Sequence, residues 1–240
     1  MERLETVFEG GVTRPFFCTH YFIDLKSIQQ NNVAMTAATI QSKTPTRRRD
    51  PKATRAKILA SAEKLLAANK GALEMAWVAK DAGISHGIAY HHFGSREGLL
   101  QAVVIAFYNQ LDDEVLMAPM AEFDSWRERE QARSRAHIAF ILEHPLGSIV
   151  TNQLSAIPTI ASIEAERWKL IVAEGARNIA DGQKRGELGT DVPPELGAAM
   201  VLGAVRGAIN QAVSEPATIN IDQLNAEVWA FLGSGLQLST

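Results

Sequence analysis

The sequence predicts an all-α protein in which a small N-terminal head of three helices precedes a larger C-terminal bundle of helices. Apolar residues repeat at the three- and four-residue spacing of helices, and no segment alternates as a half-buried strand does. The composition is 46% hydrophobic but only 7% aromatic, which favours an alanine-rich helical protein over a β-sandwich. Prolines and glycines then divide the chain into segments of helical length.

Length and composition limit the class of protein. A chain of 240 residues can form one or two domains with a sizeable core. Cys18 is the only cysteine, so an internal disulfide framework is excluded and a cytoplasmic protein is expected. No apolar run reaches the roughly 18 residues that a membrane span needs. Glu2 and Glu5 stand where a secretory signal would be basic, so we expect neither export nor a membrane partner.

The net charge of −3 hides an uneven distribution. Residues 43–110 contain 11 lysines and arginines against 5 aspartates and glutamates, whereas residues 111–240 contain 10 against 18. A basic segment followed by an acidic one fits a head that contacts nucleic acid and a body that does not. A chance difference between the two parts is the alternative.

Residues 1–46 lack the periodicity of the rest of the chain. An aromatic cluster, FFCTHYFI, precedes a polar run, QSKTPTRRRD, with no helical or alternating pattern. Met35 stands just before the polar run, so one interpretation is a disordered extension of the reading frame upstream of a start at Met35. An ordered arm packed on the body is the alternative, and the N-terminal mass of the native protein distinguishes them.

Three short helices are expected between residues 47 and 95. Asp50 can cap the first, about 51–68, and Pro51 suits its first helical position. The second runs from about Met75 to Ala82 and the third from about His86 to His92. Their apolar stripes can close on one another to form a small core, with the third helix outermost.

The turn between the second and third helices is the most informative segment. Gly83 can take the left-handed backbone that ends a helix, and Ser85 is placed to cap the next one. Gly94 and Ser95 repeat this arrangement before the fourth helix. Helix, glycine-containing turn and a helix with His and Tyr on its exposed face form the pattern of a helix-turn-helix DNA reader.

The remaining chain is predicted to form longer helices separated by Pro119, Pro145 and Pro158, because proline does not fit a helix interior. Asp222 or Asn220 is placed to cap the last one. The expected helices cover about residues 96–117, 122–143, 146–155, 159–185, 194–214 and 221–236.

Residues 50–105 resemble the tetracycline-repressor (TetR) family of bacterial transcriptional regulators. The segment AGISHGIAYHHFGSREGLL carries the resemblance, because its Gly–Ser spacing, Tyr, His-Phe and Ser-Arg-Glu fall in step with that family. The segment GQKRGELGTDVPPELGAAMVLGAVRGAINQAV, residues 182–213, is more weakly similar to the stretch that leads into the family's dimerising helix.

The resemblance implies an N-terminal helix-turn-helix DNA-binding head and a C-terminal helical ligand-binding and dimerisation bundle. It divides the chain into an extension (1–46), a DNA-binding domain (47–95) and a ligand-binding and dimerisation domain (96–240). The two heads of a homodimer would lie one DNA turn apart, roughly 34–36 Å, on a near-palindromic operator in double-stranded DNA. An unknown small-molecule effector would release the operator, as in most family members, which are repressors. No cofactor is implied.

The resemblance also places individual residues on DNA. Tyr90 can donate its hydroxyl proton to a phosphate oxygen, and Arg96 adds positive charge at a helix start. Gly87 lets the backbone approach a thymine methyl group. The arginines of the preceding arm can follow the phosphates or enter the minor groove. The full set is Arg47, Arg48, Arg49, Ser85, His86, Gly87, Ile88, Tyr90, His91 and Arg96.

The head departs from the family pattern at several positions. Ile88 stands where Thr is frequent, and Glu74 stands where a capping Thr is common. Met75 and Ala76 have no polar side chain with which to read bases, so base reading rests on few residues. A TetR-like activator, and a helical small-molecule-binding protein with a degenerate head, are therefore alternatives to a repressor.

The body contains residues suited to the wall of a ligand pocket, in which a few polar groups orient a ligand among apolar ones. His137 and His144 are seven residues apart and share a predicted helix face with Ile141. A partly buried polar pair at the edge of a core is the alternative. The candidates, chosen by residue type, are Trp126, His137, Phe140, Ile141, His144, Asn152, Trp168 and Met200.

Gly203 and Gly207 share one face of the helix predicted at residues 194–214. Small residues at this spacing let two helices approach closely. With the last helix, this face is predicted to form a four-helix dimer interface. Ordinary close packing within one chain is the alternative.

Other classes of protein lack their signatures in this sequence. No nucleophile elbow, phosphate-binding glycine loop or H-E-x-x-H motif is present, so an enzyme is not expected. His91 and His92 are adjacent and point in different directions on a helix, so no metal site is expected. A helical interaction module without DNA would not need the arginine arm. The prediction is a ligand-responsive DNA-binding transcriptional regulator.

Overall fold

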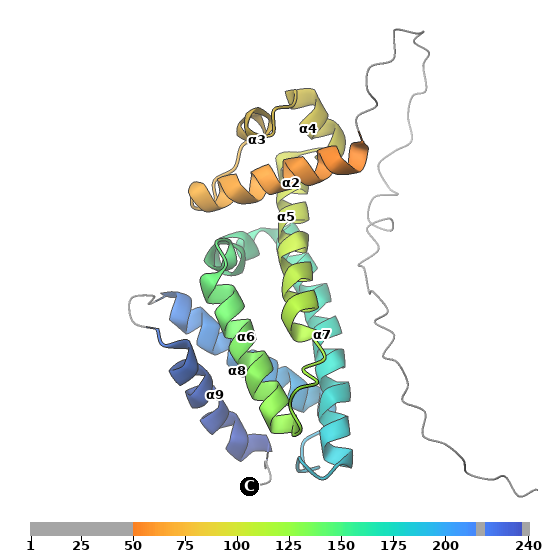
Figure 1. The fold of residues 1–240 in the computed structure, drawn as a ribbon, viewed down its shortest axis with the longest axis vertical. Coiled ribbons are helices and arrows are strands. Elements are labelled where there is room, and N and C mark those ends of the chain that lie inside the picture. Colours follow the sequence, from red (N-terminus) through yellow and green to blue (C-terminus); the bar gives the residue numbers. More distant parts are fainter. Residues whose placement is uncertain (1–49, 215–218, 237–240) are drawn as a thin grey trace, which may run out of the picture. The chain divides into compact units, whose positions relative to one another are not determined.

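The computed structural model describes residues 50–214 and 219–236, so the predictions for residues 1–46 and for Arg47, Arg48 and Arg49 lie outside the described residues. The described part is all-α and contains no strand (Figure 1). Its α-helices are α2 (Pro51–Ala68), α3 (Met75–Asp81), α4 (His86–Phe93), α5 (Arg96–Leu111), α6 (Trp126–Glu143), α7 (Pro158–Lys184), α8 (Pro194–Ser214) and α9 (Ile221–Leu236).

Helix α2 begins as the sequence predicts. The Asp50 carboxylate accepts a hydrogen bond from the backbone N–H of Lys52, 2.9 Å away, and Pro51 is the first helical residue. Ile58, Ala62 and Leu66 are completely buried and form the predicted stripe. This stripe packs against α3 and α5, so the three-helix head shares its core with the fourth helix.

Both predicted glycine turns are present in the head. Gly83 has φ +60° and Gly94 has φ +71°, conformations that cost a residue with a Cβ atom. The Ser95 hydroxyl caps α5 by accepting from the Gly98 N–H at 3.0 Å. Ser85 precedes α4 in extended backbone, but its side chain makes no capping hydrogen bond, so that detail of the prediction is wrong.

Helix α5 ends earlier than predicted, at Leu111, and continues as a π-helical turn, η1 (Asp112–Leu116). The carbonyl groups at the end of this turn are bound by a side chain from α6. The Arg133 guanidinium donates to the carbonyl oxygens of Val115 at 2.7 Å, Leu116 at 2.9 Å and Ala118 at 2.7 Å. Because Arg133 binds these carbonyl oxygens, the helix can end here without leaving unpaired acceptors.

Helix α6 begins at Trp126, four residues after the expected start. Ser125 and Glu128 form a capping box that fixes this boundary. The helix expected at residues 146–155 is instead a π-helical turn, η2 (Ile149–Gln153), followed by a 3₁₀ turn, η3 (Leu154–Ala156). Thr151 and Ser155 donate their hydroxyl protons to carbonyl oxygens four residues earlier, a contact that bends helices.

The long helices form the body. Helix α7 packs along α8, while α9 packs against α6 and α8 (Figure 1). A Cβ atom at Gly175 on α7 would lie only 3.1 Å from the Cβ of Ala198 on α8, so this glycine permits the close approach of the two helices. Helix α5 contacts α2 and α4 in the head and also α7 in the body.

Helix α8 has the length and apolar composition of a membrane-spanning helix, the one such case among residues 50–214 and 219–236. Glu195 and Arg206 interrupt the helix, so it contains no uninterrupted apolar run of about 18 residues. The same length and composition are found in helices of protein cores. One side of α8, with Ala198, Val205 and Ile209, is buried in the bundle, so the helix serves as a packing element.

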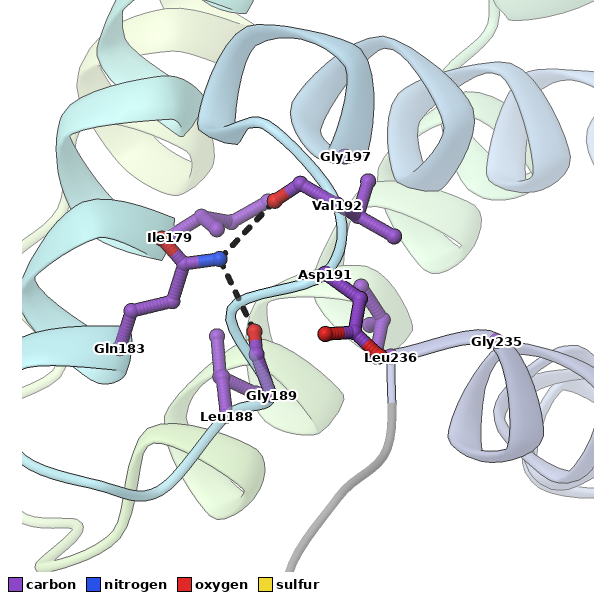
Figure 2. A pocket seen from close by; sticks show the side chains of 9 residues that line it. All are labelled: Ile179, Gln183, Leu188, Gly189, Asp191, Val192, Gly197, Gly235 and Leu236. Carbon is purple, nitrogen blue, oxygen red and sulfur yellow. Dashed lines mark hydrogen bonds between the residues drawn. The ribbon is translucent and has the colours of Figure 1, made fainter.

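The turn between α7 and α8 is held by one side chain. The Gln183 amide nitrogen donates to the carbonyl oxygens of Gly189 and Val192, each at 2.9 Å (Figure 2). The crevice beside it has a volume of about 10 Å³. This volume holds about one water molecule, so the crevice is part of the turn and no ligand site.

Candidate functional site

Helix α4 presents a polar face to solvent. Ala89 and Phe93 are buried in the head, and the side chains on the other side of the helix are exposed. Tyr90 is 42% exposed, and its ring meets the ring of His86 edge-on, with 4.8 Å between centroids. Ile88 is half-buried. The predicted DNA-contacting residues that share the exposed surface are Ser85, His86, Gly87, Tyr90 and His91.

Gly87 leaves the middle of this face open. A Cβ atom built on Gly87 would meet no other atom within 4 Å. The backbone of α4 is therefore accessible to a surface placed against the helix. His92 lies on the inner side, where burial, His91 and Arg55 lower its pKa, so the imidazole stays neutral at physiological pH.

Arg96 has a structural contact that the sequence does not reveal. Its Nε donates to the carbonyl oxygen of Leu73 at 2.6 Å, which ties the start of α5 to the segment before α3. The residue as a whole remains exposed. A substitution of Arg96 therefore changes the head itself as well as any contact with DNA.

Trp77 on α3 is a surface aromatic that sequence reasoning missed. Its side chain is 46% exposed, whereas Met75, Val78 and Ala79 of the same helix are buried. The signal was its position, because Trp77 falls outside the apolar stripe formed by those three residues. A large exposed aromatic on the first helix of the helix-turn-helix adds a flat apolar surface beside α4.

The body contains a cavity of about 60 Å³ between α5, α6, η2, α7 and α8. Each of these elements contributes to the wall, which combines aliphatic side chains with titratable and aromatic ones. The lining residues are Tyr108, Leu111, His137, Ile141, Thr151, Glu164, Arg167, Trp168, Ile171, Leu202, Arg206, Ile209 and Asn210.

Charged side chains of the cavity wall are paired across helices. Arg167 on α7 binds both carboxylate oxygens of Asp112, with 3.1 Å from its Nε to Oδ2. Glu164 accepts from the Tyr108 hydroxyl at 2.7 Å, and Arg206 on α8 lies 3.4 Å from its other oxygen. Burial raises the pKa of Asp112 despite Arg167, and burial together with Glu164 raises the pKa of Tyr108. Tyr108 is therefore a neutral donor here.

The His137 side chain is largely enclosed by protein, and it lines the cavity. Burial, with a smaller effect of Arg167, lowers its pKa to about 3. The imidazole is neutral at physiological pH. Among the described residues, no side chain or backbone group forms a hydrogen bond with it, so its ring nitrogens are available to a ligand.

The structure brings three of the predicted wall residues together in the cavity, namely His137, Ile141 and Trp168. The others lie elsewhere. His144 stacks on Phe140 with 5.2 Å between ring centroids, and Trp126 is buried against Trp229. Asn152 and Met200 are exposed. The predicted set therefore divides between the cavity, an aromatic cluster in the core and the surface.

Helices α8 and α9, which pack against each other, both expose large apolar side chains. Leu196 and Met200 are 53% and 56% exposed on α8, and Phe231 on α9 is 76% exposed. Cβ atoms built on Gly203 and Gly207 would meet nothing within 4 Å, so the predicted small-residue face is not used for packing within the described chain. Exposed apolar side chains of this size on two packed helices are suited to an interaction surface.

In the described ranges, no three histidine, cysteine, aspartate or glutamate side chains lie close enough together to hold a metal ion. Cys18 lies outside these ranges.

Comparison with known proteins places the head in a family. Residues 58–103 match the family described as "Bacterial regulatory proteins, tetR family". This range covers most of α2, all of α3 and α4, and the first half of α5. No curated protein matches the chain.

Solved structures match across head and body. A TetR-family transcriptional regulator from Pectobacterium atrosepticum is 24% identical, with 81% of this chain and 99% of that chain covered and a TM-score of 0.62. A putative TetR-family regulator from Mesorhizobium loti is 21% identical, with 80% and 98% covered and a TM-score of 0.65. The transcriptional regulator FadR from Bacillus subtilis, in complex with stearoyl-CoA, is 18% identical, with 75% and 98% covered and a TM-score of 0.64. At these identities the likeness concerns the fold.

Proposed function

Because the chain belongs to the tetR family of bacterial regulatory proteins, we propose that it is a cytoplasmic, homodimeric repressor that a small molecule releases from its operator. The observation that carries the proposal is the face of α4, where polar side chains and an open glycine backbone surround Tyr90. In a helix-turn-helix protein this helix enters the major groove of double-stranded DNA.

The contacts divide by chemistry. His86 and His91 can exchange hydrogen bonds with base edges, while Gly87 allows the helix backbone to approach them. The Tyr90 hydroxyl and the exposed N–H groups of Arg96 suit phosphate oxygens, which position a protein without reading sequence. Ser85 and Ile88 border this surface. The basic residues Arg47, Arg48 and Arg49 precede α2 and would add salt-dependent affinity.

Dimerisation is supported by the exposed apolar face of α8 and α9. Leu196, Met200 and Phe231 would lose contact with water if the same face of a second copy covered them. Gly203 and Gly207 lie along the same side of α8, where the absence of side chains lets a partner helix approach closely. A two-fold interface of this kind places two heads on the two halves of a near-palindromic operator.

Effector binding is assigned to the cavity in the body. The FadR neighbour from Bacillus subtilis was solved with stearoyl-CoA. Here the cavity of about 60 Å³ is much smaller than the 300–1,000 Å³ of typical ligand pockets, so a compact effector is expected. Tyr108 and Leu111 of α5 line it, and α5 also packs against α2 and α4 of the head. A ligand that displaces these two residues would therefore act on the helix that supports the DNA-reading face.

The proposal is tested by binding of the purified full chain to DNA from beside its own gene, with random duplex as competitor. We expect specific binding that weakens about 10³- to 10⁵-fold between about 50 and 200 mM salt if six to ten phosphates are contacted. A Tyr90→Phe/His91→Ala double variant should lose specific binding. Arg96 is left unchanged because it holds Leu73. The matched control is Arg177→Gln, an exposed residue on α7.

Equal binding by the wild type and the double variant would contradict the assignment of α4. Absence of salt-dependent DNA binding would favour the alternative, a helical small-molecule-binding protein with a degenerate head. A reporter gene behind the recovered operator distinguishes repressor from activator, because deletion of the regulator raises expression in the first case and lowers it in the second.

A further inference from the structure

The cavity in the body is balanced in charge before any ligand enters. Arg167 is bound through two of its nitrogens to Asp112, and Arg206 lies beside Glu164. Glu164 also accepts a hydrogen bond from the Tyr108 hydroxyl. Each charged side chain of the wall therefore has an opposite charge or a hydrogen-bond donor next to it.

This balance disfavours a charged ligand. The side chains of Arg167 and Glu164 are only 11% and 12% exposed, so water screens the interior of the cavity poorly. A ligand carboxylate or ammonium group would lose its own hydration there and find no unpaired counter-charge. It would also have to compete for a partner that is already bound, at a cost that a neutral molecule avoids.

Three polar side chains of the wall, those of His137, Trp168 and Asn210, form no hydrogen bond with the described residues. Asn210 is exposed to solvent and the Trp168 indole can only donate, so His137 is the group of the three that can both donate and accept within the cavity. It is neutral, and the described residues give its imidazole no hydrogen bond. A neutral imidazole offers one N–H donor and one nitrogen acceptor. A hydroxyl group on a ligand can satisfy either nitrogen, and a carbonyl oxygen can satisfy the donor.

The remaining wall limits the body of the ligand. Leu111, Ile141, Ile171, Leu202 and Ile209 supply aliphatic surface, and Trp168 adds an aromatic face. The volume of about 60 Å³ holds about four to six water molecules. A cavity of about 150 Å³ binds benzene, so a singly substituted benzene ring is the upper limit here and enters only if side chains of the wall move outward.

We propose that the cavity binds a compact, uncharged, mainly apolar molecule that carries a hydroxyl or carbonyl group and hydrogen-bonds to His137. The role of this molecule as the effector rests on the proposed function. Its binding to the cavity does not depend on DNA binding.

Four probes of similar shape test it by titration calorimetry on the full chain: benzyl alcohol, benzoate, benzylamine and ethylbenzene. We expect benzyl alcohol to bind at least tenfold more tightly than either charged probe, because the wall has no unpaired counter-charge for benzoate or for benzylamine. It should also bind about tenfold more tightly than ethylbenzene, which lacks only the hydroxyl group.

Variants connect this preference to His137. His137→Phe should remove the advantage of benzyl alcohol over ethylbenzene, whereas His137→Gln, which keeps a donor and an acceptor, should retain part of it. The matched control is His144→Phe, which removes the imidazole of the residue directly after α6, outside the cavity. The thermal unfolding midpoint of each variant without ligand shows that it is folded.

The proposal is overturned if benzoate or benzylamine binds as tightly as benzyl alcohol. It is also overturned if benzyl alcohol does not exceed ethylbenzene, including the case in which none of the four binds. If the chain binds DNA specifically but shows no preference for benzyl alcohol, the ligand proposal fails and the proposed DNA-binding function stands. If it prefers benzyl alcohol but does not bind DNA, the ligand proposal stands and the proposed DNA-binding function fails.

Discussion

The Tyr108 hydroxyl on α5 donates a hydrogen bond to the Glu164 carboxylate on α7, with 2.7 Å between the two oxygens. The Arg167 guanidinium lies over the Tyr108 ring, 4.4 Å from its centroid. Helix α5 begins in the head and α7 belongs to the body. This buried hydrogen bond therefore fixes the position of the connecting helix α5 against the helical body.

Replacing Tyr108 by phenylalanine is expected to lower the free energy of unfolding by about 1 to 3 kcal/mol. The variant keeps the ring but leaves a largely buried Glu164 without its closest donor. Urea unfolding of the full chain measures the loss. Tyr90→Phe is the matched control, because its hydroxyl is on an exposed residue and should change stability by less than about 0.5 kcal/mol. Equal losses in the two variants would contradict the prediction.

The depressed pKa of His137 predicts acid sensitivity. The folded chain keeps the imidazole neutral down to a pKa of about 3, whereas the unfolded chain takes up a proton near pH 6.5. The unfolded state thus binds more protons between these values. The contribution of the neutral imidazole to the free energy of unfolding is complete above about pH 6.5. It is lost as the pH falls, by about 1.4 kcal/mol per pH unit.

A His137→Phe variant should show a flatter stability profile between about pH 6 and 4.5. Urea unfolding across this range measures the difference in slope. Glu187, whose pKa is lowered by the Trp126 backbone N–H and by Arg185, titrates in both proteins and cancels in the comparison. Parallel profiles would show that His137 is protonated in the folded state.

Gly87→Ala is expected to separate stability from DNA binding. The new methyl group would meet no atom of the protein, and alanine favours helix by about 1 kcal/mol over glycine, so the variant should be more stable. If α4 approaches base edges closely, the same methyl group should weaken specific DNA binding by about tenfold. Unfolding and fluorescence anisotropy measure the two effects. Unchanged DNA affinity would place this part of α4 away from the bases.

Phe231→Glu is expected to convert the proposed dimer into a monomer. It places a charge in the proposed α8–α9 interface, where the phenylalanine is 76% exposed in one chain. Light scattering after size exclusion measures the mass. Affinity for a palindromic operator should fall by about a hundredfold, because the two heads no longer bind as one unit. Ala121→Glu, at an exposed site before α6, is the control. A dimer that persists in Phe231→Glu would exclude this face.

Local signals predicted the head well. Asp50 and Pro51 mark the start of α2, and Gly83 and Gly94 mark two turns, because each acts through the conformation of its own backbone. The early end of α5 was not predictable in this way. It depends on Arg133, which reaches back 15 to 18 residues to bind three carbonyl oxygens.

The cavity was only partly predictable. His137 and Ile141 share a helix face, and their type and spacing indicated a wall. Glu164, Arg167 and Ile171 were missed because acidic and basic residues on a long helix usually form a solvated face. Their spacing on α7, three and then four residues, places them on one side together with Trp168, but only the packing of α5 and α8 makes that side an interior surface.

Helix α5 supplies fully buried residues such as Leu99 and Val103 to a core shared with α2, while its later residues Phe107 and Tyr108 contact Phe140 and Glu164 in the body. A fragment that stopped at Ser95 would leave Ile58 and Leu66 of α2 without this wall. The three-helix head is thus not an independent domain that can be exchanged alone. A chimera that takes its head from another regulator has to be joined after Leu111. It then also replaces Tyr108 and Leu111, the α5 side of the cavity in the body.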